Sequence, residues 1–205
     1  MPASGLTVYL VEDDASVRDS LALMLGLAGY ATASYADAES FLAAWRPEWS
    51  GCVVTDLRLP GMSGLELQAA LRSRGAALPV IVITAHGDVP SARLAFRAAA
   101  VDFLEKPFDD AQLRAAIDTA FALEERRLGG EEARRADAAR LERLTPRERE
   151  VLEHAARGLH AKEIAAALGI SPRTVEVHKA HIMEKLGVRN VAELVRFALA
   201  GNKRS

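Results

Sequence analysis

The chain has 205 residues, of which half are hydrophobic and about a quarter are charged. This length suits one large domain or two small ones, and the composition excludes extensive disorder. The net charge of −2 is unevenly divided: residues 1–120 hold 9 Lys and Arg against 15 Asp and Glu, a net −6, whereas residues 144–205 hold 11 against 7, a net +4. This division favours an ion or signalling site in the first half and a polyanionic partner for the second.

No window reaches the ~18 apolar residues that a membrane span needs, and the N-terminus lacks the pattern of a secretion signal. The single cysteine, Cys52, lies in an apolar run, so an internal disulfide is excluded and we predict a buried strand residue. These features predict a cytoplasmic protein with no membrane partner.

Short apolar runs alternate with helix-period segments over the first 120 residues, as in successive βα units of a parallel sheet. The predicted strands are Leu6–Val11, Ala31–Tyr35, Cys52–Thr55, Val80–Thr84 and Val101–Leu104. The predicted helices are Ala15–Ala28, Asp37–Trp45, Gly64–Arg74, Val89–Ala98 and Asp109–Leu123. Right-handed crossovers favour an α/β doubly wound sheet in the order 2-1-3-4-5, with a ligand beyond the C-terminal ends of strands one and three.

We therefore place a first domain at residues 1–123. A linker rich in Glu, Arg and Ala follows at 124–143, and we expect it to be partly helical. Its Gly129-Gly130 pair argues against one unbroken helix, because each glycine costs a helix about 1 kcal/mol relative to alanine.

The remaining segment, 144–205, is predicted to be an all-α domain of four helices. These are Pro146–Arg157, Ala161–Leu168, Pro172–Leu186 and Val191–Ala200. Thr145-Pro146 and Ser171-Pro172 each place a hydroxyl at the N-cap and a proline at the first helical position. Gly169 ends the second helix and leaves a three-residue turn before the third, which is the pattern of a helix-turn-helix.

Acidic residues gather where the predicted strands one and three end. Glu12-Asp13-Asp14 follows the first strand and Asp56 ends the third. Neighbouring carboxylates need a cation, and an all-oxygen site suits Mg²⁺. We expect Asp13, Asp56 and the backbone carbonyl of Arg58 to hold Mg²⁺, with Glu12 helping through water.

Two further polar residues end the fourth and fifth strands, Thr84 with a hydroxyl and Lys106 with a positive charge. Phosphoryl transfer needs in-line positioning and charge cancellation, so Asp56 is the predicted nucleophile and Lys106 the predicted partner of the phosphoryl oxygens. Taken singly, each residue is more simply a solvated or helix-capping side chain. Their combination points to a phosphoacceptor site.

The first 120 residues resemble a two-component receiver domain. The motifs that carry the resemblance are Val11-Glu12-Asp13-Asp14, Thr55-Asp56-Leu57-Arg58-Leu59-Pro60-Gly61-Met62-Ser63-Gly64, Ile83-Thr84-Ala85-His86-Gly87 and Asp102-Phe103-Leu104-Glu105-Lys106-Pro107-Phe108. The resemblance implies that Thr84 turns toward the phosphoryl group and that Phe103 swings inward. It also implies dimerisation through the face of the Val89–Ala98 helix and the fifth strand.

The segment Leu144–Ala200 resembles the LuxR-type helix-turn-helix of the FixJ/NarL response regulators. Leu144-Thr145-Pro146-Arg147-Glu148, Lys162-Glu163-Ile164-Ala165, Ile170-Ser171-Pro172-Arg173-Thr174-Val175-Glu176-Val177-His178 and Lys185-Leu186-Gly187-Val188 are among the residues that carry the likeness. This resemblance implies a double-stranded DNA partner read in the major groove.

Spacing divides the third helix of this domain into two faces. Val175, Ile182 and Leu186 share one face and are expected to pack on the core, with Met183 beside them. The expected phosphate contacts are Lys162, Arg173, Lys179 and Lys185, and the candidates for base edges are Thr174, Glu176, Val177 and Ala180. Glu176 is alternatively an intrahelical partner of Lys179, and His178 and His181 have a spacing that can bind metal, although exposure is the simpler interpretation.

Together these features predict a response regulator that accepts a phosphoryl group on Asp56 from a sensor histidine kinase. Phosphorylation would promote a homodimer and DNA binding. One alternative is a phosphohydrolase that uses Asp56 and Mg²⁺, which leaves the basic domain unexplained. The other is a constitutive DNA-binding protein whose first domain only dimerises.

Overall fold

The computed structural model describes residues 5–85, 100–190, 193–195 and 197, and it divides into two compact units, Met1–Leu128 and Gly129–Ser205. The first unit holds a parallel sheet in the order β2-β1-β3-β4-β5, as predicted. The strands are β1 (Thr7–Val11), β2 (Ala31–Tyr35), β3 (Gly51–Asp56), β4 (Val80–Thr84) and β5 (Asp102–Glu105). Each strand lies within one residue of its predicted bounds.

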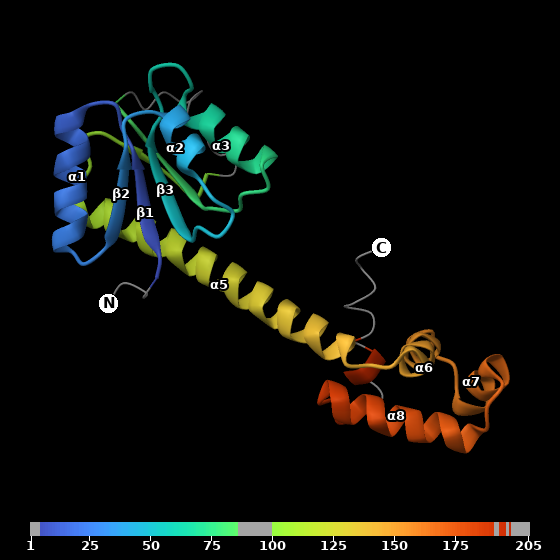
Figure 1. Ribbon diagram of the computed structural model, residues 1–205. Coiled ribbons are helices and arrows are strands. Elements are labelled where there is room, and N and C mark those ends of the chain that lie inside the picture. The colour runs from blue at the N-terminus through green and yellow to red at the C-terminus, as the bar shows by residue number, and fades with distance from the viewer. Residues whose placement is uncertain (1–4, 86–99, 191–192, 196, 198–205) are drawn as a thin grey trace. The chain divides into compact units, whose positions relative to one another are not determined.

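Helices cover both faces of this sheet (Figure 1). They are α1 (Ala15–Leu27), α2 (Ala38–Ala44), α3 (Gly64–Ser73) and α5 (Asp110–Glu142). Alternate strand residues face opposite ways, so Val8 and Val54 pack with α1 and α5, whereas Tyr9 and Val53 pack with α2 and α3. Cys52 is buried on the same face of the sheet as Val8 and Val54, as predicted. The predicted helix Val89–Ala98 lies outside the described residues.

The prediction of a helix break at Gly129-Gly130 is wrong, because α5 runs without interruption over 33 residues. Its N-terminal half is nucleated by packing, since Leu113 and Ile117 are fully buried against the sheet. Extending an existing helix adds a hydrogen bond per residue, and the Glu, Arg and Ala residues around the glycines are strong helix formers. The cost of two glycines, about 2 kcal/mol, is spread over this long helix.

The second unit contains α6 (Pro146–Ala156), α7 (Ala161–Leu168) and α8 (Pro172–Leu186), where the sequence predicts them. Ser171 caps α8 by accepting a hydrogen bond from the Thr174 N–H. Gly169 ends α7 with φ of 66°, a left-handed conformation that glycine adopts without strain. The residues described from the predicted Val191–Ala200 helix are helical, namely 193–195 and 197.

The core of the second unit forms where the three helices meet. Val151 from α6, Ile164 from α7, and Val175, Ile182 and Leu186 from α8 are all fully buried. Met183 packs against this cluster from its edge. The predicted inward face of α8 is therefore confirmed, which fixes the opposite face as the one turned to solvent.

Candidate functional site

The register of the sheet gathers the polar residues that follow the strands. Val11 pairs with Thr55, Asp56 with Ile83, and Thr84 with Glu105. Because all five strands are parallel, the next residues along the chain meet at one edge of the sheet. Glu12 after β1, Asp56 at the end of β3 and Lys106 after β5 are thereby brought together.

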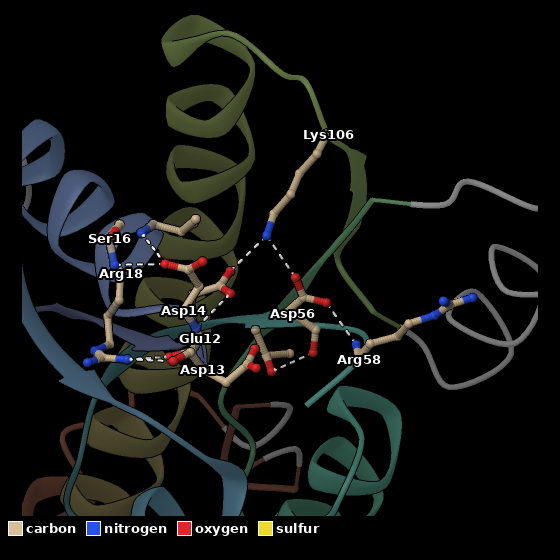
Figure 2. Close-up of polar contacts among 10 residues, drawn as sticks. Glu12, Asp13, Asp14, Ser16, Arg18, Asp56, Arg58 and Lys106 are labelled. Carbon is tan, nitrogen blue, oxygen red and sulfur yellow. Dashed lines mark hydrogen bonds and ion pairs between the residues drawn. The ribbon is translucent and has the colours of Figure 1, made fainter. Parts of the chain in front are cut away.

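One ammonium group bridges two carboxylates at this edge (Figure 2). Lys106 Nζ donates to Asp56 Oδ2 at 2.8 Å and to Glu12 Oε2 at 2.8 Å. Glu12 is only 5% exposed, whereas Asp56 remains partly open to solvent. The sequence predicted the three residues as neighbours, and the structure brings them into direct contact.

The surroundings of Lys106 favour the charged form of its side chain. Burial by itself would lower the pKa of the Lys106 ammonium, but hydrogen bonds to Asp56 and Glu12, together with their negative charges, outweigh burial and raise the pKa. Lys106 therefore carries a full positive charge at neutral pH. It supplies the cation that two adjacent carboxylates require.

The second oxygen of Asp56 is held by the backbone. Its Oδ1 accepts a hydrogen bond of 2.8 Å from the Arg58 N–H. The backbone at Gly64 passes close to the end of β3, since a Cβ atom placed on Gly64 would lie 2.4 Å from the Asp56 carbonyl oxygen. Glycine at the start of α3 thus lets the helix begin directly behind the Asp56 carboxylate.

Two side chains hold the loop after β1 in place. One is Asp14, the N-cap residue of α1, and the other is Arg18, in the first turns of α1. Asp14 Oδ1 accepts hydrogen bonds from the Ser16 and Val17 N–H groups and so caps α1. Arg18 NH1 donates to the carbonyl oxygens of Glu12 at 2.7 Å and Asp13 at 3.3 Å. Arg18 is not among the site residues predicted from the sequence. An available signal was its position in the first turn of a helix, where the helix dipole disfavours a cation.

The other predicted site residues lie around the group formed by Glu12, Asp56 and Lys106. The side chain of Asp13 is exposed beside Glu12. Thr84 is buried at the end of β4, and its carbonyl oxygen accepts the Lys106 N–H at 2.7 Å. Phe103 is half-buried on β5 and packs against the cluster under α2 and α3. His86 lies outside the described residues.

The carboxylates do not form a ready-made metal cluster. Within residues 5–85, 100–190, 193–195 and 197, no group of three or more His, Cys, Asp and Glu side chains is arranged to hold a metal ion. Lys106 binds the two carboxylates instead. The proposed donors of Asp13, Asp56 and the Arg58 carbonyl are nevertheless all oxygen atoms at a solvent-accessible edge, so their chemistry fits Mg²⁺.

The solvent face of α8 carries most of the residues predicted to contact DNA. Arg173, Thr174, Val177 and Ala180 are exposed, and Lys162 on α7 is exposed as well. Val177 is 48% exposed, so it offers an apolar surface to solvent on this face of α8. The helix thus presents one cation, Arg173, at its start and the small apolar side chains of Val177 and Ala180 in its middle.

The two units of the chain match two known protein families. Residues 8–118 match the response regulator receiver domain, and residues 142–198 match the bacterial regulatory proteins of the luxR family. The chain belongs to the response regulators. It combines a receiver domain with a LuxR-type helix-turn-helix domain.

Among its relatives are named transcriptional regulatory proteins and a response regulator of known structure. It is 48% identical to the transcriptional regulatory protein FixJ of Azorhizobium caulinodans, covering 97% of this chain and 94% of that protein. It is 44% identical to the C4-dicarboxylate transport transcriptional regulatory protein DctR of Rhodobacter capsulatus, covering 94% and 98%. The solved structure of the response regulator StyR is similar at a TM-score of 0.83, with 42% identity over 96% of this chain and all of that one.

The structure of this response regulator corrects the prediction for Lys179. Lys179 was expected on the groove side of α8, but it is 8% exposed, and its Nζ donates to Glu176 Oε1 at 3.2 Å. The alternative interpretation of Glu176 as an intrahelical partner is therefore confirmed. The sequence spacing could have predicted this burial. Residue 179 stands four positions after Val175 and three before Ile182, so it lies on the inward face of the helix.

Lys185 is also placed differently from its prediction as a phosphate contact. Its Nζ donates to Glu148 Oε1 at 2.9 Å and Oε2 at 2.6 Å, and it thus ties the last turn of α8 to the first turn of α6. Glu148 is 3% exposed and also accepts hydrogen bonds from the Thr145 N–H and hydroxyl. Burial favours the neutral acid, but these hydrogen bonds dominate and lower the pKa of Glu148.

Two remaining predictions concern metals and membranes. His178 and His181 belong to no metal-binding group among the residues that the structure describes. In the same parts of the chain, no helix is both long and apolar enough to cross a membrane.

Proposed function

We propose that this response regulator is a phosphorylation-controlled transcription factor whose acceptor is Asp56 and whose phosphoryl donor is a sensor histidine kinase in the cytoplasm. The observation that carries the proposal is the contact of Lys106 with both Asp56 and Glu12. A preorganised cation beside a partly exposed carboxylate is what a phosphoryl group needs at its equatorial oxygens.

The chemistry is a displacement at phosphorus. An Asp56 carboxylate oxygen forms a bond to the phosphorus atom while the bond from phosphorus to the kinase histidine nitrogen breaks, and the leaving imidazole takes up a proton. Lys106 moves its hydrogen bond from Asp56 Oδ2 to a phosphoryl oxygen. Thr84 and Phe103 are proposed to respond to the new group, with the Thr84 hydroxyl as a donor to it.

Asp13, Asp56 and the Arg58 carbonyl are the residues that would hold Mg²⁺, with Glu12 acting through water. When bound, Mg²⁺ supplies the positive charge that lets an anionic donor approach a carboxylate-rich edge. Arg18 supports these ligands by fixing the carbonyl groups of Glu12 and Asp13.

The second unit is proposed to read double-stranded DNA through α8. Lys162 and Arg173 are the proposed phosphate contacts, because both side chains are exposed near the start of a helix. Thr174, Val177 and Ala180 are the proposed contacts to base edges, and the last two suit thymine methyl groups. Glu176 can accept from a cytosine amino group through its Oε2, because Lys179 binds only Oε1.

Phosphorylation is proposed to act by pairing two copies of the chain. The proposed pairing face includes β5 and the Val89–Ala98 segment, of which the structure describes only β5. Two recognition helices spaced by one turn of DNA, about 34 Å, would bind far more tightly than one.

The test is to measure phosphorylation, oligomeric state and DNA binding of the full chain with and without acetyl phosphate and Mg²⁺. Wild type should gain one phosphoryl group by intact mass, dimerise and bind its DNA more tightly, whereas Asp56→Asn should do none of these. A matched control, Asp14→Asn, alters a carboxylate that caps α1 and should respond like wild type.

Three outcomes would contradict this proposal. Equal responses of wild type and Asp56→Asn would eliminate the switch. If Asp56→Asn without a phosphodonor is already a dimer and binds DNA as tightly as phosphorylated wild type, the protein is a constitutive DNA-binding protein. Steady turnover of small phosphate esters would instead indicate a phosphohydrolase.

A further inference from the structure

The loop between β3 and α3 lies beside Asp56 and contributes to its site. Residues 57–63 form this loop, and its second residue, Arg58, donates its N–H to Asp56 Oδ1 at 2.8 Å (Figure 2). The Arg58 carbonyl is also a proposed ligand of Mg²⁺. Mg²⁺ demands near-ideal octahedral geometry at about 2.1 Å, so its binding depends on how firmly this loop is held.

Apolar side chains anchor the loop on the body of the receiver unit. Leu57 and Leu59 are each 9% exposed and belong to the core cluster that contains Phe41 of α2. Met62 packs against the same cluster. Apolar burial has no directional preference, so it keeps the loop on the core without fixing the orientation of the peptide groups.

One carboxylate from outside the loop binds the loop backbone. Glu39, in the first turn of α2, accepts a hydrogen bond from the Met62 N–H at 3.1 Å through its Oε1. The same oxygen would lie 2.7 Å from a Cβ atom placed on Gly61, so the carboxylate uses space that is free only because residue 61 is glycine. Glu39 stands 23 positions before Met62, and the contact therefore fixes the loop relative to α2.

The simpler role for a glutamate in the first turn of a helix is to complement the helix dipole. In α2, however, the N-cap residue Asp37 accepts the Ser40 N–H through Oδ1 at 2.6 Å. Asp37 thus provides the cap of α2, and the Glu39 carboxylate is directed at the backbone of another segment. This placement is the reason to consider a role for Glu39 at the Asp56 site.

We propose that Glu39 is a positioning residue for this site: by fixing the Gly61-Met62 backbone, it keeps the loop in the form that presents the Arg58 carbonyl to Mg²⁺. The inference rests on the proposed function of Asp56 and extends it to a residue of α2. In this role Glu39 touches neither the ion nor the phosphoryl group. A loop that spends less time in the competent form binds Mg²⁺ more weakly in the same proportion.

The test is Mg²⁺ binding by the unphosphorylated full chain, followed by amide NMR shifts during titration with magnesium chloride. Glu39→Ala removes the acceptor and should raise the dissociation constant about threefold to tenfold, the range expected for loss of one hydrogen bond. Glu39→Gln keeps an oxygen that can accept from Met62 but removes the charge, and it should stay within about twofold of wild type. Glu48→Ala removes an exposed carboxylate shortly before β3 and should bind like wild type.

A rate measurement then separates positioning of the metal from damage to the acceptor. Phosphorylation by acetyl phosphate should be slower in Glu39→Ala at low Mg²⁺ and should approach the wild-type rate once Mg²⁺ is saturating. A loss that persists at saturating Mg²⁺, or equal weakening in Glu39→Gln and Glu39→Ala, would overturn the inference. Mg²⁺ binding that is present in wild type and unaltered in Glu39→Ala would overturn it as well. Absence of Mg²⁺ binding in wild type would refute the proposed function together with this inference.

Discussion

Lys106 Nζ lies 2.8 Å from Asp56 Oδ2, although 50 positions separate the two residues in the chain. The contact exists because β3 and β5 flank β4 in parallel and end at the same edge of the sheet. The site is therefore held by the sheet as a whole, and several consequences of this arrangement can be measured.

Replacing Lys106 by Met should destabilise the receiver unit by about 1–3 kcal/mol at neutral pH, because two neighbouring carboxylates lose their shared cation. The measurement is urea unfolding followed by near-UV circular dichroism. Lys162→Met, an exposed lysine of the second unit, is the control and should leave the receiver transition unchanged.

The pH dependence of that difference follows from the raised pKa of Lys106. A pKa that is higher in the folded state gives stability that is complete below the ordinary lysine pKa of about 10.5 and is lost as the pH rises through the folded value. The difference between wild type and Lys106→Met should thus be constant from neutral pH to about 10 and then shrink. A difference that grows above pH 10.5 would contradict the ion pair.

Gly64→Ala should destabilise the receiver by about 1–3 kcal/mol, since the new methyl group would lie 2.4 Å from the Asp56 carbonyl oxygen. It should also slow phosphorylation, because relief of the clash moves Asp56 or α3. Gly26→Ala is the matched control within α1, where no atom lies within 4 Å, and should stabilise by about 0.5–1 kcal/mol. Equal effects of the two substitutions in chemical unfolding would show that Gly64 is not constrained.

Glu148→Gln should destabilise the second unit by about 1–3 kcal/mol at neutral pH, because Lys185 loses its charged partner. The folded pKa of Glu148 is lowered, so its contribution is present above the ordinary glutamate pKa and is lost as the pH falls through the lower folded value. The gap between wild type and variant in thermal unfolding should therefore narrow below about pH 4.5. The exposed pair of Arg147 and Glu150 provides the control, and Glu150→Gln should cost under about 0.5 kcal/mol.

Salt dependence of DNA binding should distinguish Lys162 from Lys185. Lys162→Gln should lower the slope of log K against log salt by about one unit, as expected on loss of a phosphate contact. Lys185→Gln should leave the slope unchanged while lowering the thermal stability of the second unit, because its ammonium is bound to Glu148. If both variants lose one unit of slope, the ion pair opens on DNA.

Alanine at Gly129 or Gly130 should stabilise the middle of α5 by about 1 kcal/mol per site. Both positions are exposed, and an added Cβ atom would meet nothing within 4 Å, so the gain is a helix propensity effect alone. Hydrogen exchange of the amides from 126 to 135 should slow in each variant. Unchanged exchange would mean that the glycines do not limit the local stability of this helix.

The sequence by itself determined the elements and their order. Alternating apolar runs predicted every strand within one residue, because a strand buried on both faces has a strong and local signature. Proline after a hydroxyl residue marked where α6 and α8 begin, and the motifs around Asp56 and Lys106 pointed to the end of the sheet where these two side chains meet. Spacing alone also assigned Val175, Ile182 and Leu186 to the core.

The tertiary structure decided what each charged side chain touches, which depends on residues far away in the chain. Lys185 has the sequence context of a surface cation, and only the packing of α6 against α8 places it on Glu148. The length of α5 was decided by anchoring of its first half on the sheet, which local glycine propensity does not report. Hydrogen bonds and ion pairs form across distances of a few ångströms, so their partners are fixed only when the whole fold has brought the strands and helices together.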